Sequence, residues 1–155
     1  VTCPRELPEG DFSFDLSAGG ELAPTMAAAC AFVNGRVELA GIAHLRGHET
    51  DRLAALAAEI NRLGGTAHDT ADSLVIEAPL PATAEAAPVL ARPYDHHRMA
   101  TFAAIIGLRR PNGVVQNVAT VAKTMPEVTA MWEDMLAQWQ AGASTSDVTA
   151  DQEVF

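Results

Sequence analysis

The sequence predicts a mixed α and β fold (α+β) in which helices pack on one face of a sheet. Segments with the alternating apolar and polar pattern of strands take turns with segments whose apolar residues recur at helical spacing. Gly-Gly or Asn-Gly pairs separate several of these segments, at 19–20, 34–35 and 64–65. Such alternation is typical of strands that bury one face against helices.

Length and composition indicate a globular protein. The 155 residues suffice for one domain, and 48% of them are hydrophobic, enough for a sizeable core. The net charge of −10 opposes binding to nucleic-acid phosphates. No apolar run reaches the about 20 residues of a membrane-spanning helix and no signal-peptide pattern is present, so we expect a cytoplasmic protein without a membrane partner. Cys3 and Cys30 lack metal-ligand spacing and are interpreted as ordinary thiols.

The first strand and helix follow an irregular lead-in over 1–11. Phe12, Phe14 and Leu16 alternate with polar residues, which predicts a half-buried strand. An alanine-rich helix is expected over 21–35, where Asn-Gly is the stop signal.

Two further strands flank the most regular helix. Residues 36–42 and 73–78 have strand composition. A helix is predicted over 53–63, ended by a glycine pair. Its apolar face is formed by Leu53, Leu56, Ala57, Ile60 and Leu63.

The second half of the chain begins with a connection rich in proline and alanine over 79–93. A polar cluster at 94–98 then opens a helix. The apolar face of this helix is formed by Met99, Phe102, Ala103 and Ile106. Residues 111–113 are predicted to form a turn and residues 114–119 a strand.

A last helix is predicted after the capping-box pattern Thr-Met-Pro-Glu at 124–127. Its apolar stripe consists of Val128, Met131, Trp132, Met135, Leu136 and Trp139. We interpret this stripe as core packing, not as a cofactor site. Small and acidic residues dominate after it, so we expect a domain over 1–140 and a disordered acidic tail over 141–155.

Charged residues gather where the predicted helices begin. Arg52, Arg98 and Lys123 each stand at such a start, although the helix dipole is positive there and disfavours a cation. Unpaired backbone N–H groups at helix starts also bind anions. If these ends converge, they form a site for a phosphate or a carboxylate, with Glu21 and Glu49 placed for proton transfer.

Each cluster also has a purely structural interpretation. Glu21 and Glu49 could each stabilise a helix dipole by a few tenths of a kcal/mol. Arg52 could pair with its neighbour Asp51 or extend into solvent. The adjacent histidines at 96–97 could form a weak metal pair, but neighbours on a helix point to different sides, so no metal is expected. These interpretations explain each cluster singly and leave their recurrence at several helix starts unexplained.

Three motifs resemble the EPSP synthase (3-phosphoshikimate 1-carboxyvinyltransferase) family. The first is Gly-His-Glu-Thr-Asp-Arg-Leu-Ala-Ala-Leu at 47–56, followed by Leu-Gly-Gly at 63–65. The second, His-His-Arg-Met-Ala at 96–100, matches the Asp-His-Arg-Met-Ala motif of that family. The third is the lysine before a Thr-x-Pro-Glu helix start, at 122–127. Together they cover roughly residues 12–140, which correspond to about the C-terminal third of a family member.

The resemblance implies transfer of the enolpyruvyl group of phosphoenolpyruvate to the 5-hydroxyl of shikimate 3-phosphate, with release of phosphate and without a metal or organic cofactor. By motif position, Glu21 would orient and deprotonate the shikimate hydroxyl, Glu49 would handle the proton at the phosphoenolpyruvate methylene, and Lys123 would neutralise the leaving phosphate. Arg52 and Arg98 would clamp phosphoenolpyruvate. The complete substrate-binding set implied is His44, His48, Arg52, His97 and Arg98.

The resemblance also implies a fold of repeated βαβαββ units, with helices packed on mixed sheets and helix N-termini facing the active site. The family's site lies between two domains, so the missing N-terminal portion is an implied partner and this chain alone would be inactive. The residues at 21, 44, 48 and 96 depart from the family's usual Asp, Asn-like residue, Lys and Asp. Two alternatives stay open: a degenerate, non-catalytic remnant that acts as a binding module, and a UDP-N-acetylglucosamine enolpyruvyl transferase relative.

Overall fold

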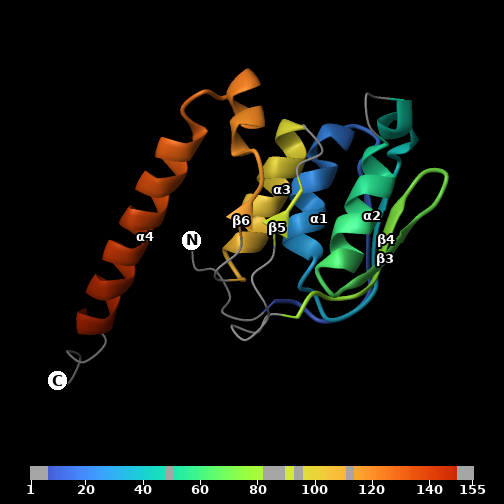
Figure 1. The fold of residues 1–155 in the computed structure, drawn as a ribbon. Helices are drawn as coiled ribbons and strands as arrows, with labels where there is room; N and C mark the ends of the chain where they lie inside the picture. The colour runs from blue at the N-terminus through green and yellow to red at the C-terminus, as the bar shows by residue number, and fades with distance from the viewer. Residues whose placement is uncertain (1–6, 48–50, 82–89, 93–95, 111–113, 150–155) are drawn as a thin grey trace.

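A βαβαββ unit occupies the first half of the chain in the computed structural model, which describes residues 7–47, 51–81, 90–92, 96–110 and 114–149 (Figure 1). The order of its strands in the sheet is β1-β2-β4-β3. Strands β1 and β2 are parallel, whereas β4 is antiparallel to both of its neighbours. Its elements are β1 (Phe12–Asp15), a 3₁₀ turn η1 (Gly20–Leu22), α1 (Ala23–Cys30), β2 (Val37–Ala40), a 3₁₀ turn η2 (Ala43–Gly47), α2 (Arg52–Arg62), β3 (Thr66–Asp69) and β4 (Leu74–Ala78).

The core lies between this sheet and helices α1 and α2. Strand register places Phe14 opposite Leu39 and Val37 opposite Ile76, so apolar side chains line up across the strands. Both helices lie on the same side of the sheet in Figure 1, and α3 packs against α1. The buried face of α1 is mainly alanine, and small side chains allow helices to approach closely. Fully buried residues of this core include Val37, Leu39, Ile42, Leu45, Leu53, Leu56, Ile60, Leu74 and Ile76.

A second, partial unit follows. Strands β5 (Leu90–Ala91) and β6 (Val114–Val115) pair in parallel and are joined through α3 (His97–Gly107). This order repeats the β1-α1-β2 start of the first unit. A 3₁₀ turn η3 (Val118–Lys123) and helix α4 (Val128–Thr149) complete the described chain. The prediction of an α+β fold with repeated units and mixed sheets is therefore confirmed.

Several element boundaries were predicted wrongly. The helix expected over 21–35 is a 3₁₀ turn followed by α1, which ends at Cys30 because the chain turns there, with the Val33 amide donating to the Cys30 carbonyl. Gly35 precedes β2 and has a φ of +141°, which residues other than glycine rarely adopt. A Cβ at this position would come within 2.1 Å of the Gly10 carbonyl oxygen, so the chain needs a glycine here to enter β2. The sequence did not predict β3, whose apolar content is low.

The start of the last helix also differs from the prediction. Thr124 closes η3 instead of capping α4, and its hydroxyl donates to the Val121 carbonyl oxygen over 3.3 Å. The strand expected over 114–119 is limited to β6 because η3 begins at Val118. Helix α4 continues to Thr149, into the stretch predicted as a tail. The turn predicted at 111–113 lies outside the described residues.

The apolar stripe of α4 is not core. In Figure 1 this helix stands away from α1, α2 and α3, and the side chains of Met131, Met135 and Trp139 are 55%, 41% and 60% exposed. The core interpretation of this stripe is therefore wrong for the chain as described. The periodicity predicted an apolar face correctly, but nothing in the described chain covers all of it.

Candidate anion-binding site

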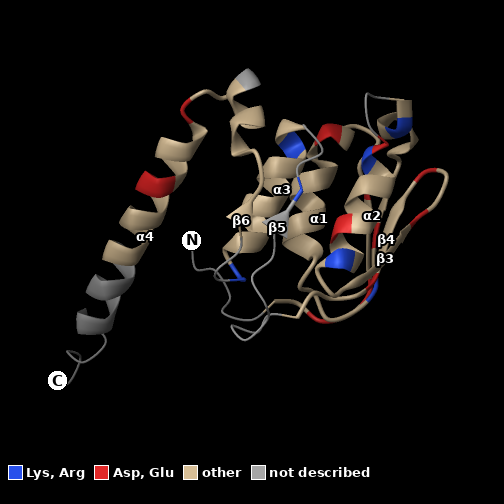
Figure 2. Cartoon of the chain, viewed as in Figure 1, with Lys and Arg blue, Asp and Glu red and all other residues tan. Residues whose placement is uncertain are grey.

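Two arginines from different helices meet one glutamate. Arg52 Nη1 donates to Glu21 Oε2 over 2.7 Å, and Arg98 Nε lies 2.7 Å from the same oxygen. Arg98 Nη1 also donates to the Glu21 backbone carbonyl over 3.0 Å. Figure 2 shows basic and acidic positions together at the N-terminal ends of α1, α2 and α3. The helix starts that carry Arg52 and Arg98 therefore meet at Glu21, whereas the position of the Lys123 side chain lies outside the described part of the chain.

Helix α2 places Arg52 in its first position and buries it. Asp51 is the N-cap, and its Oδ1 accepts from the amides of Leu53 and Ala54 over 3.1 Å each. Asp51 is thus occupied by the helix end, and Arg52 does not pair with it. The Arg52 side chain is 6% exposed, which excludes the alternative of an arginine extended into solvent.

The buried guanidinium of Arg52 keeps one unused donor. Its Nε is buried and has no hydrogen-bond partner within the described part of the chain. A buried N–H without an acceptor costs free energy, on the order of 1–3 kcal/mol. Arg98 Nε contacts the Glu21 carboxylate as an ion pair but is not aligned for a hydrogen bond. The pair therefore offers donors that a further acceptor can use.

His96 caps α3 and stays neutral beside the arginines. Its Nδ1 accepts from the Arg98 amide over 3.2 Å, which requires that nitrogen to be unprotonated. Burial lowers the pKa of His96 to about 4, with further contributions from Arg52, His97 and Arg98. At neutral pH the imidazole therefore adds no charge, and Glu21 with the two arginines leaves one net positive charge.

The rings of His96 and His97 stack, with centroids 4.7 Å apart and planes inclined by 17°. The expectation that they point to different sides is wrong, because His96 has extended backbone angles and only His97 belongs to the helix. Within the described residues no group of three His, Cys, Asp or Glu side chains is placed to hold a metal.

His44 lies against the segment that carries Glu21. A Cβ built on Gly20 would come within 2.3 Å of His44 Cε1 and Nε2, so the imidazole fills the space beside this glycine. His44 is exposed, and it stands at the rim of the site and not between the arginines. The structure thus places it beside Glu21 without direct contact to Arg52 or Arg98 among the contacts of the described residues.

Sequence reasoning missed Arg46, which fixes the polar stretch between β2 and α2. Its Nη1 donates to Asp51 Oδ2 over 2.7 Å and its Nη2 donates to Asp69 Oδ2 over 2.6 Å. These carboxylates raise the pKa of Arg46, and the hydrogen bond to Asp69 makes the largest contribution. Asp72 adds a bond from its Oδ1 to the Ala43 amide over 2.9 Å. The acidic β3–β4 turn was the available signal, because its two Asp residues, Asp69 and Asp72, have no other obvious partner in the sequence.

The side chains of three predicted site residues lie outside the described part of the chain. His48 and Glu49 lie outside the described residues. Lys123 ends η3, and its side chain is also outside the description. Their assigned roles stay predictions.

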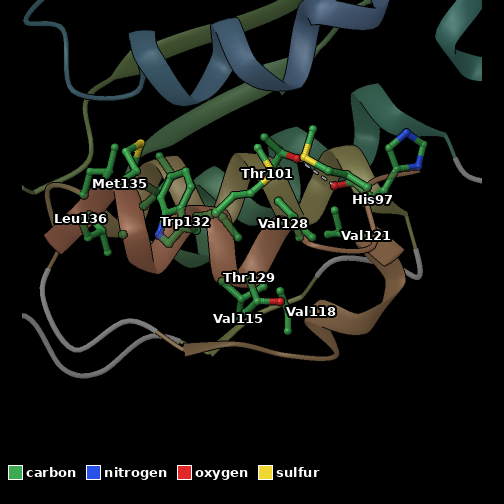
Figure 3. Close-up of a pocket in the computed structure, with 18 of the residues that line it drawn as sticks. His97, Thr101, Val115, Val118, Val121, Val128, Thr129, Trp132, Met135 and Leu136 are labelled. Atoms are coloured by element: carbon green, nitrogen blue, oxygen red, sulfur yellow. Dashed lines mark hydrogen bonds between the residues drawn. The ribbon is translucent and has the colours of Figure 1, made fainter. Parts of the chain in front are cut away.

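A groove with a volume of about 1100 Å³ extends from the site along α3 and α4. His97 and Arg98 line one part of it, and the remainder is mostly apolar. Figure 3 shows Val121, Val128, Trp132 and Met135 among the side chains around it. The groove therefore joins a polar site to an apolar surface.

The fold and the site define an α+β protein with one βαβαββ unit, the start of a second, and a charged cluster of Glu21, Arg52 and Arg98 at helix N-terminal ends. Residues 8–132 match the sequence model of EPSP synthase (3-phosphoshikimate 1-carboxyvinyltransferase). The chain belongs to the EPSP synthase family.

Relatives with this name agree in sequence. The 3-phosphoshikimate 1-carboxyvinyltransferase of Kocuria rhizophila is 54% identical over 136 residues, and that of Bifidobacterium longum is 51% identical over 126 residues. These matches cover 88% and 81% of this chain, but the chain spans only 29% and 28% of the two relatives.

Solved structures agree in fold. One EPSP synthase structure from Acinetobacter baumannii has a TM-score of 0.64 and 25% identity, with 77% of this chain and 28% of that chain covered. A second from the same organism has a TM-score of 0.58 and 24% identity, with 72% of this chain and 26% of that chain covered.

Among the described helices, none combines the length and the apolar character needed to cross a membrane.

Proposed function

We propose that this chain supplies part of the active site of a 3-phosphoshikimate 1-carboxyvinyltransferase. The observation that carries the proposal is the cluster of Glu21, Arg52 and Arg98, which joins three helix starts in a chain of that family. The reaction transfers the enolpyruvyl group of phosphoenolpyruvate to the 5-hydroxyl of shikimate 3-phosphate and releases phosphate. Its natural place is the cytoplasm.

Arg52 and Arg98 bind the anionic groups of phosphoenolpyruvate in this proposal. Arginine suits the task because its planar fork donates to two oxygens of a carboxylate or phosphate. The buried Arg52 Nε supports it, since a bound anion supplies the acceptor that the described chain lacks. Burial also strengthens each contact, because the effective dielectric constant is lower than in water.

The remaining roles follow motif position. Glu21 takes the proton of the shikimate hydroxyl, Glu49 handles the proton at the phosphoenolpyruvate methylene, and Lys123 neutralises the leaving phosphate. His97 lies beside Arg98, and His44 and His48 face the shikimate side. The reaction uses no metal or organic cofactor, because arginines and lysine supply the positive charge that metal ions supply in other phosphate sites.

The portion that precedes this segment in the relatives is the proposed partner. It contributes the opposite wall of the site, and the described chain alone is inactive. The apolar groove beside α3 and α4 supports this partnership, because it continues directly from Arg98.

A single-chain chimera tests the proposal. The segment of the Kocuria rhizophila relative that matches this chain is replaced by this chain, and phosphate release from phosphoenolpyruvate is measured with shikimate 3-phosphate or UDP-N-acetylglucosamine as the acceptor. The proposal predicts release with shikimate 3-phosphate only. Release with the nucleotide sugar would assign the alternative transferase, and a folded chimera that releases no phosphate would leave a non-catalytic binding module.

A further inference from the structure

The anion expected beside Arg52 is a side chain of the protein itself. Glu21 Oε2 lies 2.7 Å from Arg52 Nη1 and 2.7 Å from Arg98 Nε, so one carboxylate oxygen faces both guanidinium groups. A carboxylate of phosphoenolpyruvate seeks the same kind of donor with the same geometry. Both carboxylates cannot occupy one position between two arginines.

We propose that Glu21 is an internal competitor for the arginine pair: its carboxylate holds the place of the ligand's carboxylate, and ligand binding displaces it. This inference rests on the proposed function. It adds a step to that function, because the free chain carries an occupied anion site instead of an open one.

Displacement requires only a side-chain movement. Arg98 Nη1 holds the Glu21 backbone carbonyl over 3.0 Å, so the segment η1 stays attached to α3 when the carboxylate leaves. The Glu21 side chain is 44% exposed, and water can solvate the carboxylate once it has turned away. Arg52, in contrast, cannot follow it, because its side chain is 6% exposed and packed at the start of α2.

The ligand has a donor available that Glu21 does not use. Arg52 Nε is buried and unpartnered within the described residues, whereas Glu21 engages only Nη1, so a ligand with several anionic oxygens can engage more nitrogens of Arg52 than Glu21 does. The additional contact lowers the free energy of the ligand-bound state and so favours exchange. A ligand that replaced the Glu21 contact without adding another would gain little.

The exchange links the two substrates. While Glu21 faces the arginines, it is not available to a hydroxyl group. Once phosphoenolpyruvate occupies the arginines, the carboxylate is released beside the bound ligand. Binding of the donor substrate therefore activates the group that serves the acceptor, without a movement of helices.

The length of Glu21 is essential to the competition. An aspartate is shorter by one C–C bond, about 1.5 Å, and does not reach both arginines from a backbone held by Arg98. Glu21→Asp therefore opens the arginine pair while the net charge of the chain stays at −10. Glu21→Gln opens it by removing the charge.

Calorimetric titration of phosphoenolpyruvate into the full chain tests the inference. Glu21→Gln is expected to bind on the order of tenfold more tightly than the natural chain, the equivalent of one hydrogen bond to a charged group. Glu21→Asp is expected to bind more tightly as well, by a smaller factor. Circular dichroism verifies that each variant is folded.

A matched carboxylate on the sheet controls for the change in net charge. Glu77 on β4 is 41% exposed and lies 3.7 Å from the nearest nitrogen of Arg36, so Glu77→Gln removes a comparable ion pair outside the site. It should leave the affinity unchanged. The double variant Glu21→Gln with Arg52→Gln should lose the increase in affinity for phosphoenolpyruvate, because that increase depends on the arginine pair.

The outcomes separate the inference from the proposed function. If Arg52→Gln weakens binding but both Glu21 variants bind no more tightly than the natural chain, Glu21 does not compete and the inference is wrong, while the anion site remains. If no variant binds phosphoenolpyruvate and the chimera releases no phosphate, both proposals fail. Tighter binding by Glu21→Asp is the decisive supporting result, because no charge has changed.

Discussion

Glu21 and Arg52 are separated by 31 residues in sequence, and their side chains meet at 2.7 Å. The contact joins the start of the first helix segment to the start of α2, across the strand β2 that lies between them in the chain. Because β1 and β2 are parallel, the segments that follow them begin at the same edge of the sheet. The βαβ connection therefore brings the two charges together.

The cap of α2 provides a prediction on stability. Asp51 accepts from two amides and also pairs with Arg46 at 2.7 Å. Asp51→Ala removes both contributions, and we expect the free energy of unfolding to fall by about 1–2 kcal/mol. Asp51→Asn keeps an N-cap acceptor and loses the charge, so its loss should be smaller. Urea unfolding followed by circular dichroism measures both, and equal losses in the two variants would contradict the capping role.

The neutral state of His96 makes stability depend on pH. The pKa of His96 is lowered from 6.5 to about 4 in the folded chain. Between these values the unfolded chain binds more protons than the folded chain does. The contribution of His96 to the free energy of unfolding is therefore complete above pH 6.5 and is lost as the pH drops toward 4. The natural chain should therefore lose thermal stability on acidification from pH 7 to pH 5.

A variant isolates this contribution. His96→Asn retains an N-cap acceptor for the Arg98 amide but does not titrate. Its midpoint of thermal unfolding should fall less between pH 7 and pH 5 than that of the natural chain. Parallel curves for the two proteins would show that His96 is not the group responsible.

The exposed stripe of α4 predicts self-association. Met131, Met135 and Trp139 are large, apolar and 41–60% exposed in the described chain, and they lie along one groove. Sedimentation velocity should show oligomers whose proportion rises with protein concentration. Replacing Met135 and Trp139 with serine should shift the chain toward monomer, whereas Gln138→Ser on the same helix should not. A monomeric natural chain at high concentration would contradict the prediction.

Local patterns predicted most of the first unit. The helical spacing of Leu53, Leu56 and Ile60 identified α2 and its buried face, because that face packs on the sheet without help from distant segments. The unexpected cation at Arg52 also predicted a nearby anion. Its identity as Glu21 did not follow from the sequence, because it depends on the pairing of β1 with β2.

Features that depend on long-range packing were not predictable. The stripe of α4 has the periodicity of a core helix, and periodicity does not reveal whether a partner surface is present. The stacked rings of His96 and His97 result from the extended backbone at the cap, whereas the sequence suggested two helical neighbours. Arg46 was missed because its carboxylate partner Asp69 belongs to a strand with little apolar character.

The most direct test of the central claim is the turnover of the chimera with and without Arg52. Phosphate release is measured at varied phosphoenolpyruvate concentration for the chimera and for its Arg52→Gln and Arg36→Gln variants. Arg36 serves as the control because its side chain is 42% exposed and lies away from the site. We predict that Arg52→Gln lowers kcat/KM for phosphoenolpyruvate by on the order of tenfold or more, while Arg36→Gln leaves it unchanged. A folded Arg52→Gln chimera with the same kcat/KM as its parent would contradict the assignment of Arg52 and Arg98 as the anion site.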